Sequence, residues 1–336
     1  MNNEIFIDWV TASQYHSQGG LPILSGGLIV QYDPAGIPRF ERNQSASIEG
    51  SYDSRLRVGC DGFRVSISGN VGRFSRQNNL YNYNWEFTKK ALNRILLNIG
   101  FPAFTASTGV EGQQNFKRGA VVSRLDITCN YGCGNELRAR AVIASLTEKS
   151  ISRMKKGNSG DESVWWANTR HMLKAYIKHL EMKHHGISEE DPSYMHAVEN
   201  AIVRVELELK KRTLSELNLN DWADITQQKL EKLFHENTTL IQNIDADSDI
   251  FTLETLPPKS RIYASAWLDG RDVRAITSRA TFFRQAKILR EHGIDISEIK
   301  NVKKLPVKTR FIDLVPLKPP GWYAEDNKFE PLKRVA

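Results

Sequence analysis

The chain has 336 residues and a formal net charge of +7, with 40% hydrophobic and 25% charged residues. This is ordinary globular composition, and the length allows about two domains. The sequence contains no apolar run of about 18 residues and no basic and apolar amino-terminal segment, so we expect a cytosolic protein without a membrane partner. Three cysteines, Cys60, Cys129 and Cys133, are too few for a disulfide framework, and we expect free thiols.

The positive charge is concentrated in one segment. Residues 258–310 contain 13 Lys or Arg against 5 Asp or Glu, so the rest of the chain is close to neutral. A localised basic segment points to a polyanionic partner such as nucleic acid. The alternative is a basic helix face that only meets water.

The first hundred residues predict mainly antiparallel β-structure. Residues 55–60 and 63–68 both alternate, and Asp61-Gly62 between them predicts a type I′ turn with positive φ at both positions. Another turn is predicted at residues 33–36, Asp-Pro-Ala-Gly. Residues 85–98 carry apolar residues at helical spacing and are followed by Gly100, which predicts a helix.

Three strands with polar faces are predicted in the middle of the chain, at residues 121–128, 171–178 and 203–210. A helix at 135–148 follows the first, and residues 162–167 form a hairpin with the second. Side chains at every second position share a face of a strand. The polar faces therefore carry Arg124, Asp126 and Thr128; Lys174, Tyr176 and Lys178; and Arg204, Glu206, Glu208 and Lys210.

If these strands share a sheet, carboxylates, a tyrosine and lysines meet on one face. Such a face suits phosphodiester cleavage by a tyrosine nucleophile beside a carboxylate-held metal ion. Glu206 and Glu208 are like charges two residues apart, and a bound cation would compensate them. Two alternatives stay open: half-buried strands normally show a polar face to water, and Arg204 and Lys210 would neutralise these acids internally.

The chain becomes helical after residue 210, with helices predicted at 214–217 and 225–235 and a domain boundary near residue 245. We therefore predict a domain at 1–245 and a second region at 246–336 that ends in a strand. Three short helices at 260–268, 271–276 and 278–292 suggest a helix-turn-helix. The last would bury Phe282, Ile288 and Leu289 and turn a set of cations toward DNA, Arg279, Arg284, Lys287 and Arg290.

Four motifs, in this order, resemble the replication initiators of filamentous bacteriophages, the gene II protein type, which are related to rolling-circle plasmid initiators. The motifs are Ser-Arg-Leu-Asp at 123–126, Lys-Ala-Tyr-Ile-Lys-His-Leu-Glu at 174–181, Val-Arg-Val-Glu at 203–206, and the run from Arg310-Phe-Ile-Asp to Pro320-Gly-Trp-Tyr323. The resemblance extends from about residue 50 to the end of the chain.

The resemblance implies an α+β protein, in which an antiparallel-sheet catalytic domain with flanking helices precedes a helical, basic DNA-binding region. It implies that Tyr176 attacks the plus-strand phosphodiester at the replication origin and becomes joined to the 5′ phosphate. Reversal of this reaction then closes the displaced strand into a circle. Tyrosine has a pKa near 10, so only about one phenol in a thousand is ionised at neutral pH. Lys178 or Lys174 would supply the positive charge that favours attack.

The resemblance also implies Mg²⁺ or Mn²⁺ as the cofactor, because acids of the matching motifs are suitable ligands. Asp126 and Glu206 are the expected ligands, with Glu181 and Glu208 as further ones. Arg124 and Arg204 would orient these carboxylates or touch DNA, or else are inter-strand ion-pair partners. The expected partners are the phage double-stranded replicative-form DNA and its single plus strand in the host bacterial cytoplasm, with a host helicase and polymerase left open.

Two other functions remain open. One is a non-catalytic origin-binding or operator-binding regulator derived from such an initiator, in which the carboxy-terminal helices do the work. The other is a metal-dependent nuclease that uses water in place of tyrosine. The joint presence of Tyr176, Lys178, Glu181, Asp126 and Glu206 favours the nicking and joining enzyme, because a DNA-binding regulator needs none of them for chemistry.

Overall fold

The computed structural model describes residues 4–109, 111–242, 256–268, 271–291, 296–297 and 314–326. The chain forms two compact units, residues 1–242 together with 314–336, and residues 243–313. We predicted one boundary near residue 245, with all later residues in the second region. The structure instead returns residues 314–326 to the first unit, where Val315–Pro316 pairs with a central strand.

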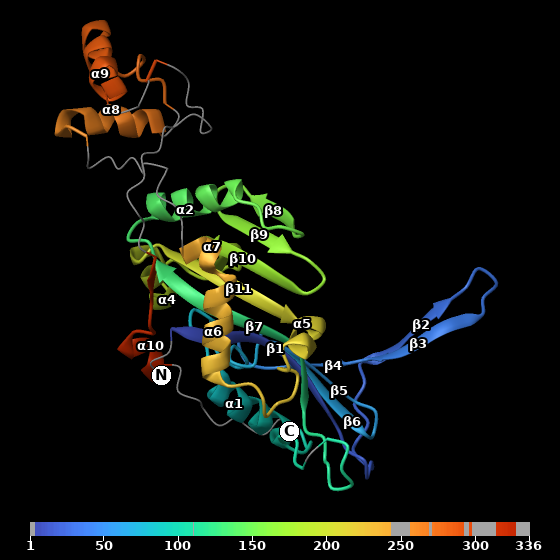
Figure 1. Cartoon of the computed structure of the whole chain (residues 1–336). Coiled ribbons are helices and arrows are strands. Elements are labelled where there is room, and N and C mark those ends of the chain that lie inside the picture. The colour runs from blue at the N-terminus through green and yellow to red at the C-terminus, as the bar shows by residue number, and fades with distance from the viewer. Residues whose placement is uncertain are drawn as a thin grey trace. The chain divides into compact units, whose positions relative to one another are not determined.

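A large antiparallel sheet forms the framework of the first unit (Figure 1). Its strand order is β4-β5-β6-β1-β7-β11-β10-β9-β8, with β12 paired to β7. The strands are β1 Ile5–Tyr15, β4 Ala46–Glu49, β5 Arg55–Cys60, β6 Arg64–Gly69, β7 Val121–Gly132, β8 Lys155–Ser159, β9 Ser163–Ala167, β10 His171–Ile177, β11 Ile202–Lys210 and β12 Val315–Pro316. A separate hairpin, β2 Gly27–Tyr32 and β3 Pro38–Gln44, extends away from this sheet.

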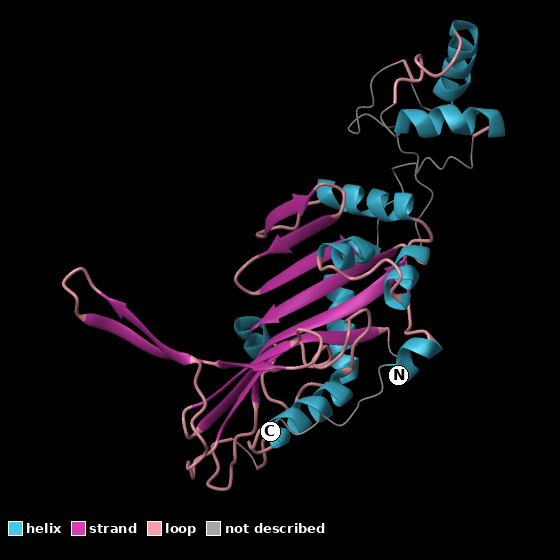
Figure 2. Ribbon diagram, turned by 180° about the vertical axis from the view of Figure 1, so that it is seen from behind, coloured by secondary structure: helices cyan, strands magenta, loops and turns pink. Residues whose placement is uncertain are grey.

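Helices lie against the sheet and at its ends. Those of the first unit are α1 Trp85–Asn98, α2 Glu136–Glu148, α3 Lys178–His184, α4 Pro192–Glu199, α5 Lys211–Glu216, α6 Gln227–Asn237, α7 Thr239–Gln242 and α10 Gly321–Asp326. The asparagines at 84 and 135 cap α1 and α2 by accepting a backbone N–H through their side chains. Seen from the opposite side in Figure 2, the central strands are in open view. No helix in the described ranges is long and apolar enough to cross a membrane.

The predicted alternation is confirmed in the central strands. Leu125, Ile127, Leu207 and Leu173 are buried on one face, and α2 packs against β9 and β10. The polar residues predicted on the other face are brought together, because β7, β11 and β10 are neighbours in that order. The mixed α+β class with a large antiparallel sheet is therefore confirmed. The cysteines at 60, 129 and 133 are buried free thiols, as predicted.

Two local predictions are wrong. The β5–β6 connection is not a type I′ turn, because Gly62 has a φ of 95° while Asp61 does not have positive φ. The Asp61 carboxylate instead accepts the backbone N–H groups of Phe63 and Arg64 at 2.9 and 2.7 Å, which fixes a wider loop. Residues 273–276 form turns where we predicted a helix.

The described part of the second unit contains two helices, α8 Pro258–Leu268 and α9 Arg279–Glu291. They enclose a small core that includes Trp267, Val273, Phe282 and Leu289, so the predicted burial of Phe282 and Leu289 is confirmed. Ile288 is only half-buried. Residues 269–270, the predicted turn, and 292–293, the predicted end of the last helix, lie outside the described residues.

Candidate active site

Tyr176 lies on β10, directly opposite Arg204 of β11 and Ser163 of β9. Its side chain is 5% exposed, and its hydroxyl donates a hydrogen bond to Glu206 Oε1 at 2.6 Å. The Lys174 ammonium lies 4.3 Å from the centre of the phenol ring. Burial raises the pKa of Tyr176 well above 10, the Glu206 charge raises it further, and Arg204 opposes the shift. The phenol is therefore protonated and held by a carboxylate.

Glu206 occupies the position on β11 between Lys174 of β10 and Thr128 of β7. Burial raises the pKa of Glu206, and the charge of Asp8 adds to this effect. Lys174 and Arg204 act in the opposite direction. A second carboxylate therefore lies near enough to Glu206 to affect its ionisation.

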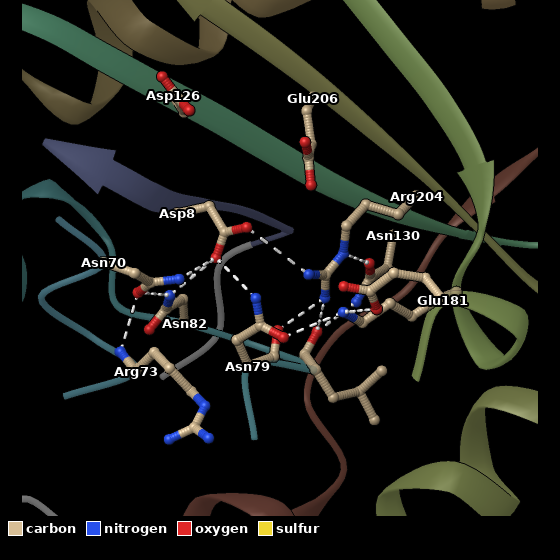
Figure 3. A network of polar contacts seen from close by, with 12 residues as sticks. Asp8, Asn70, Arg73, Asn79, Asn82, Asp126, Asn130, Glu181, Arg204 and Glu206 are labelled. Carbon is tan, nitrogen blue, oxygen red and sulfur yellow. Dashed lines mark hydrogen bonds and ion pairs between the residues drawn. The ribbon is translucent and has the colours of Figure 1, made fainter. Parts of the chain in front are cut away.

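Asp8 is placed by an irregularity in β1. Ile7 is opposite Ile127, and Trp9 is opposite Asp126, so β1 contains one extra residue at this point of its pairing with β7. Such a bulge redirects a side chain, here the carboxylate of Asp8. Three asparagines donate hydrogen bonds to Asp8 Oδ1, Asn70 at 2.7 Å, Asn82 at 3.0 Å and Asn79 at 3.4 Å (Figure 3).

Arg204 is fully buried beside these groups. Its Nε donates to Asn130 Oδ1 at 2.9 Å, and Nη2 donates to the carbonyl of Asn79 at 2.8 Å and to the carbonyl of Leu80. Nη1 lies 3.7 Å from Asp8 Oδ2. With 0% of its surface exposed, Arg204 does not reach DNA in this arrangement, which corrects the expectation of a DNA contact. It joins β1, β7, β11 and the loop before α1.

Asp126 and Glu208 share a different arginine. Arg124 binds Asp126 through Nε and Nη2 at 2.9 and 2.7 Å, and Nη2 lies 3.0 Å from Glu208 Oε2. Burial raises the pKa of Asp126 to about 7, although the bidentate arginine opposes this shift. Arg124 is 38% exposed at its side chain and lies 5.1 Å from the centre of the Trp9 ring. It therefore remains accessible to a ligand on this face.

Lys178 is the first residue of α3, where we predicted the end of a strand. Its buried ammonium donates to Glu181 Oε2 at 2.6 Å and to Asn79 Oδ1 at 3.0 Å. Burial and Arg204 lower the pKa of Lys178 to about 8. Burial alone would raise the pKa of Glu181, but Lys178, Arg204 and His185 together outweigh it and the net shift is downward. Glu181 is thus part of an ion pair at the start of α3.

The four acids predicted as metal ligands already have cationic or donor partners. Glu206 is bound to Tyr176, Asp126 to Arg124, Glu208 to Arg124 and Lys210, and Glu181 to Lys178. Within the described ranges, no three His, Cys, Asp or Glu side chains form a group suited to one metal ion. The adjacent His184 and His185 are mostly exposed and face separate acids.

Sequence reasoning missed Asp8, Asn79 and Asn130. Asn130 continues the polar face of β7 two residues beyond Thr128, so a longer predicted strand would have included it. Asp8 is a lone acid in an apolar strand, and that isolation was an available signal. Asn79 lies in a loop without periodicity, so the sequence carried no comparable signal for it.

Two family profiles match the chain, and both describe the phage replication-associated protein known as the gene II protein. The profile for its amino-terminal part matches residues 7–228, and that for its carboxy-terminal part matches residues 256–329. The replication-associated protein of Enterobacteria phage I2-2 is 25% identical over 98% of this chain and 99% of its own length. That of Escherichia phage If1 is 26% identical over 81% of this chain and 98% of its own length. The expected resemblance is confirmed, and the chain belongs to the gene II replication-associated protein family of filamentous phages.

Proposed function

We propose that this protein initiates phage DNA replication by nicking the plus strand at the origin and later rejoining that strand into a circle. The observation that carries the proposal is the hydrogen bond from the Tyr176 hydroxyl to Glu206, with Lys174 over the phenol ring. A tyrosine on a polar sheet face, aligned by a carboxylate and close to a cation, is arranged for nucleophilic attack. Family membership makes phage DNA the substrate to test.

In the proposed reaction, the Tyr176 oxygen bonds to the scissile phosphorus as the bond from phosphorus to the 3′ oxygen breaks. The phenol proton leaves along the hydrogen bond toward Glu206, and the 3′ oxygen takes up a proton as the free hydroxyl. Attack by a 3′ hydroxyl on the phosphotyrosine reverses both changes and joins the strand. Because Tyr176 is 5% exposed, the phosphate reaches it only after a neighbour moves. Lys174 is half-buried and is the cation that an incoming phosphate would attract.

A divalent cation suits the acids beside Tyr176. The charge of Asp8 adds to the effect of burial in raising the pKa of Glu206, so the two negative charges repel, and a bound cation would relieve this repulsion. Mg²⁺ is commonly held by one or two carboxylates plus substrate phosphates, so a third acid is not required. Glu206 and Asp8 would hold the ion, and Asp126 would join them on release from Arg124. When bound, Mg²⁺ or Mn²⁺ would stabilise negative charge on the transferring phosphoryl group.

The second unit supplies the proposed duplex contacts. The basic residues at 279, 284, 287 and 290, hereafter the α9 cations, are exposed on α9. Exposed cations on one helix supply sequence-independent affinity for phosphates. The first unit would carry out the strand cleavage itself.

The experiment is an adduct assay with a 3′-labelled single-stranded oligonucleotide that spans the phage origin, with Mg²⁺ present. The wild type is expected to give a protein–DNA band on a denaturing gel, and Tyr176→Phe to give none. Tyr194→Phe is the matched control, because it removes one oxygen from another buried tyrosine of the same unit. Excess EDTA is expected to remove the wild-type adduct.

Other outcomes of this assay would indicate a different function. Cleavage without an adduct, retained in Tyr176→Phe, would indicate a nuclease that uses water. Origin binding by the wild type without cleavage of any substrate would indicate a DNA-binding regulator. Full adduct formation in excess EDTA would remove the metal from the proposal and leave the tyrosine chemistry in place.

A further inference from the structure

Trp165 lies in the same cross-sheet row as the candidate active-site residues. The strand registers place Thr128, Glu206, Lys174, Trp165 and Gly157 side by side on β7, β11, β10, β9 and β8. Adjacent strands are about 4.8 Å apart, so Trp165 is one strand away from Lys174 and two from Glu206. It is also the diagonal neighbour of Tyr176, which faces Ser163. The indole therefore belongs to the polar face that carries Tyr176.

The Trp165 ring rests directly on the backbone of β8. A Cβ atom added to Gly157 would lie 2.5 Å from Cζ2 of the indole and 2.7 Å from Cε2, so only glycine leaves room for the ring. The ring has the β8 backbone beneath it, yet Trp165 remains partly exposed. The adjacent Trp166 differs: it is fully buried on the opposite face and its Nε1 donates to the Lys149 carbonyl. Core packing accounts for Trp166 and does not require Trp165.

Two lysines flank Trp165 on this face. Lys174 is directly opposite it on β10 and lies over the Tyr176 ring. Lys155 is two residues from Gly157 on β8 and is exposed. An accessible aromatic ring between cations that track a phosphate backbone is the usual arrangement for binding single-stranded nucleic acid, because every base has a π face. A duplex would keep its bases stacked on one another and give the indole nothing to stack on.

We propose that Trp165 is a stacking platform for an unpaired base of the substrate strand, close to the phosphodiester that Tyr176 attacks. Lys155 and Lys174 would contact the phosphates on either side of that base. The proposal rests on the proposed function, since the strand is placed by its reaction at Tyr176. It adds a residue that would hold one unpaired base next to the scissile phosphodiester.

The test measures binding separately from chemistry. Fluorescence anisotropy with a labelled single-stranded origin oligonucleotide compares Trp165→Leu with Trp165→Phe, both in a Tyr176→Phe background. Stacking on a base increases affinity by about 5-fold to 150-fold. Trp165→Leu is therefore expected to bind more weakly by this factor, and Trp165→Phe to keep most of the affinity. Binding to duplex origin is expected to be unchanged by either variant. Circular dichroism and melting temperature identify any variant that fails to fold. If Trp165→Leu does not fold, Trp165→Thr replaces it, because a β-branched residue suits a strand and offers no ring for stacking.

An abasic scan of the oligonucleotide identifies the stacked base. One abasic position is expected to weaken binding in the Trp165 protein and to have no further effect in Trp165→Leu, because the two partners of one contact are then both absent. If every abasic effect is the same in both proteins, or if Leu binds as tightly as Trp, the stacking role is overturned. Neither readout needs Tyr176, so absence of an adduct in the wild type would overturn the nicking proposal separately.

Discussion

Removal of the buried guanidinium of Arg204 is expected to destabilise the first unit strongly. In Arg204→Met, a side chain of similar length fills the site without charge, so the effect comes mainly from lost polar contacts. Asn130 Oδ1 and the Asn79 carbonyl lose their donor, whereas the Leu80 carbonyl keeps the Asn130 amide at 2.7 Å. The Asp8 carboxylate also loses its cation.

The expected magnitude follows from these losses. Breaking one side of a buried ion pair costs about 3–5 kcal/mol, which is a large part of the roughly 5–15 kcal/mol that holds a domain folded. For a domain of this size, that corresponds to a fall in melting temperature of roughly 6–20 °C. Urea denaturation at pH 7, followed by tryptophan fluorescence, measures it.

Arg124→Met is the matched control on the same sheet face. Its side chain is 38% exposed, and exposed ion pairs contribute only about 0–1 kcal/mol. The pKa of the Asp126 carboxyl is already raised to about 7 with Arg124 beside it, so loss of the guanidinium makes this carboxyl easier to protonate. If the free energies of unfolding of Arg204→Met and Arg124→Met differ by less than about 1 kcal/mol, the Arg204 guanidinium is not a structural link between these strands. The double variant Asp8→Asn/Arg204→Met is expected to lose less stability than the two single variants lose together. The reason is that the double variant leaves neither the Asp8 carboxylate nor the Arg204 guanidinium without its partner.

Three further outcomes are expected. Tyr323→Phe should lower the free energy of unfolding by about 1–3 kcal/mol in urea denaturation, because the Tyr323 hydroxyl binds Asn78 Oδ1, the Tyr81 carbonyl and Arg76; no loss would mean that α10 does not secure the first unit. Lys178 has a pKa lowered to about 8 by burial, so the folded state releases its proton before the unfolded state does. The free energy of unfolding of the wild type, relative to that of Lys178→Met/Glu181→Gln, should therefore rise between about pH 8 and 10.5. Urea titrations at several pH values measure it, and a difference that does not change with pH would contradict the lowered pKa of Lys178. Neutralising all four α9 cations should flatten the salt dependence of duplex binding by up to roughly 3–4 in log–log slope, whereas equal slopes in anisotropy titrations would show that these residues face only solvent.

The strands of the site were predictable because their side chains alternate. The sequence placed Tyr176, Glu206 and Asp126 on polar faces, and the sheet order then brought these faces together. Alternation records which residues share a face but not what covers that face. Arg204 was therefore expected at a surface, whereas the loop that supplies the Asn79 and Leu80 carbonyls buries it completely.

Irregular backbone explains most of the remaining differences. The bulge at Asp8 changes the register by one residue, and a pattern of period two gives no sign of such an insertion. Lys178 continues the alternation of β10 in sequence but begins α3 in the structure, which ties Glu181 to it in an i,i+3 pair. The segment 271–276 is too short for helical periodicity to be distinguished from successive turns.

The position of Tyr323 constrains the order in which this protein completes its fold during synthesis. The hydroxyl of Tyr323 reaches back to the segment around Asn78, and β12 pairs with β7 across nearly two hundred residues of chain. The second unit is thus an insertion in the sequence of the first, tethered at both of its ends. Residues 315–323 must be synthesised and must leave the ribosome before the first unit can acquire β12 and the buried Tyr323. Until then the nascent sheet leaves the β7 edge at Tyr131 and Gly132 without the partner that β12 provides, and this edge is where premature association between unfinished chains would begin.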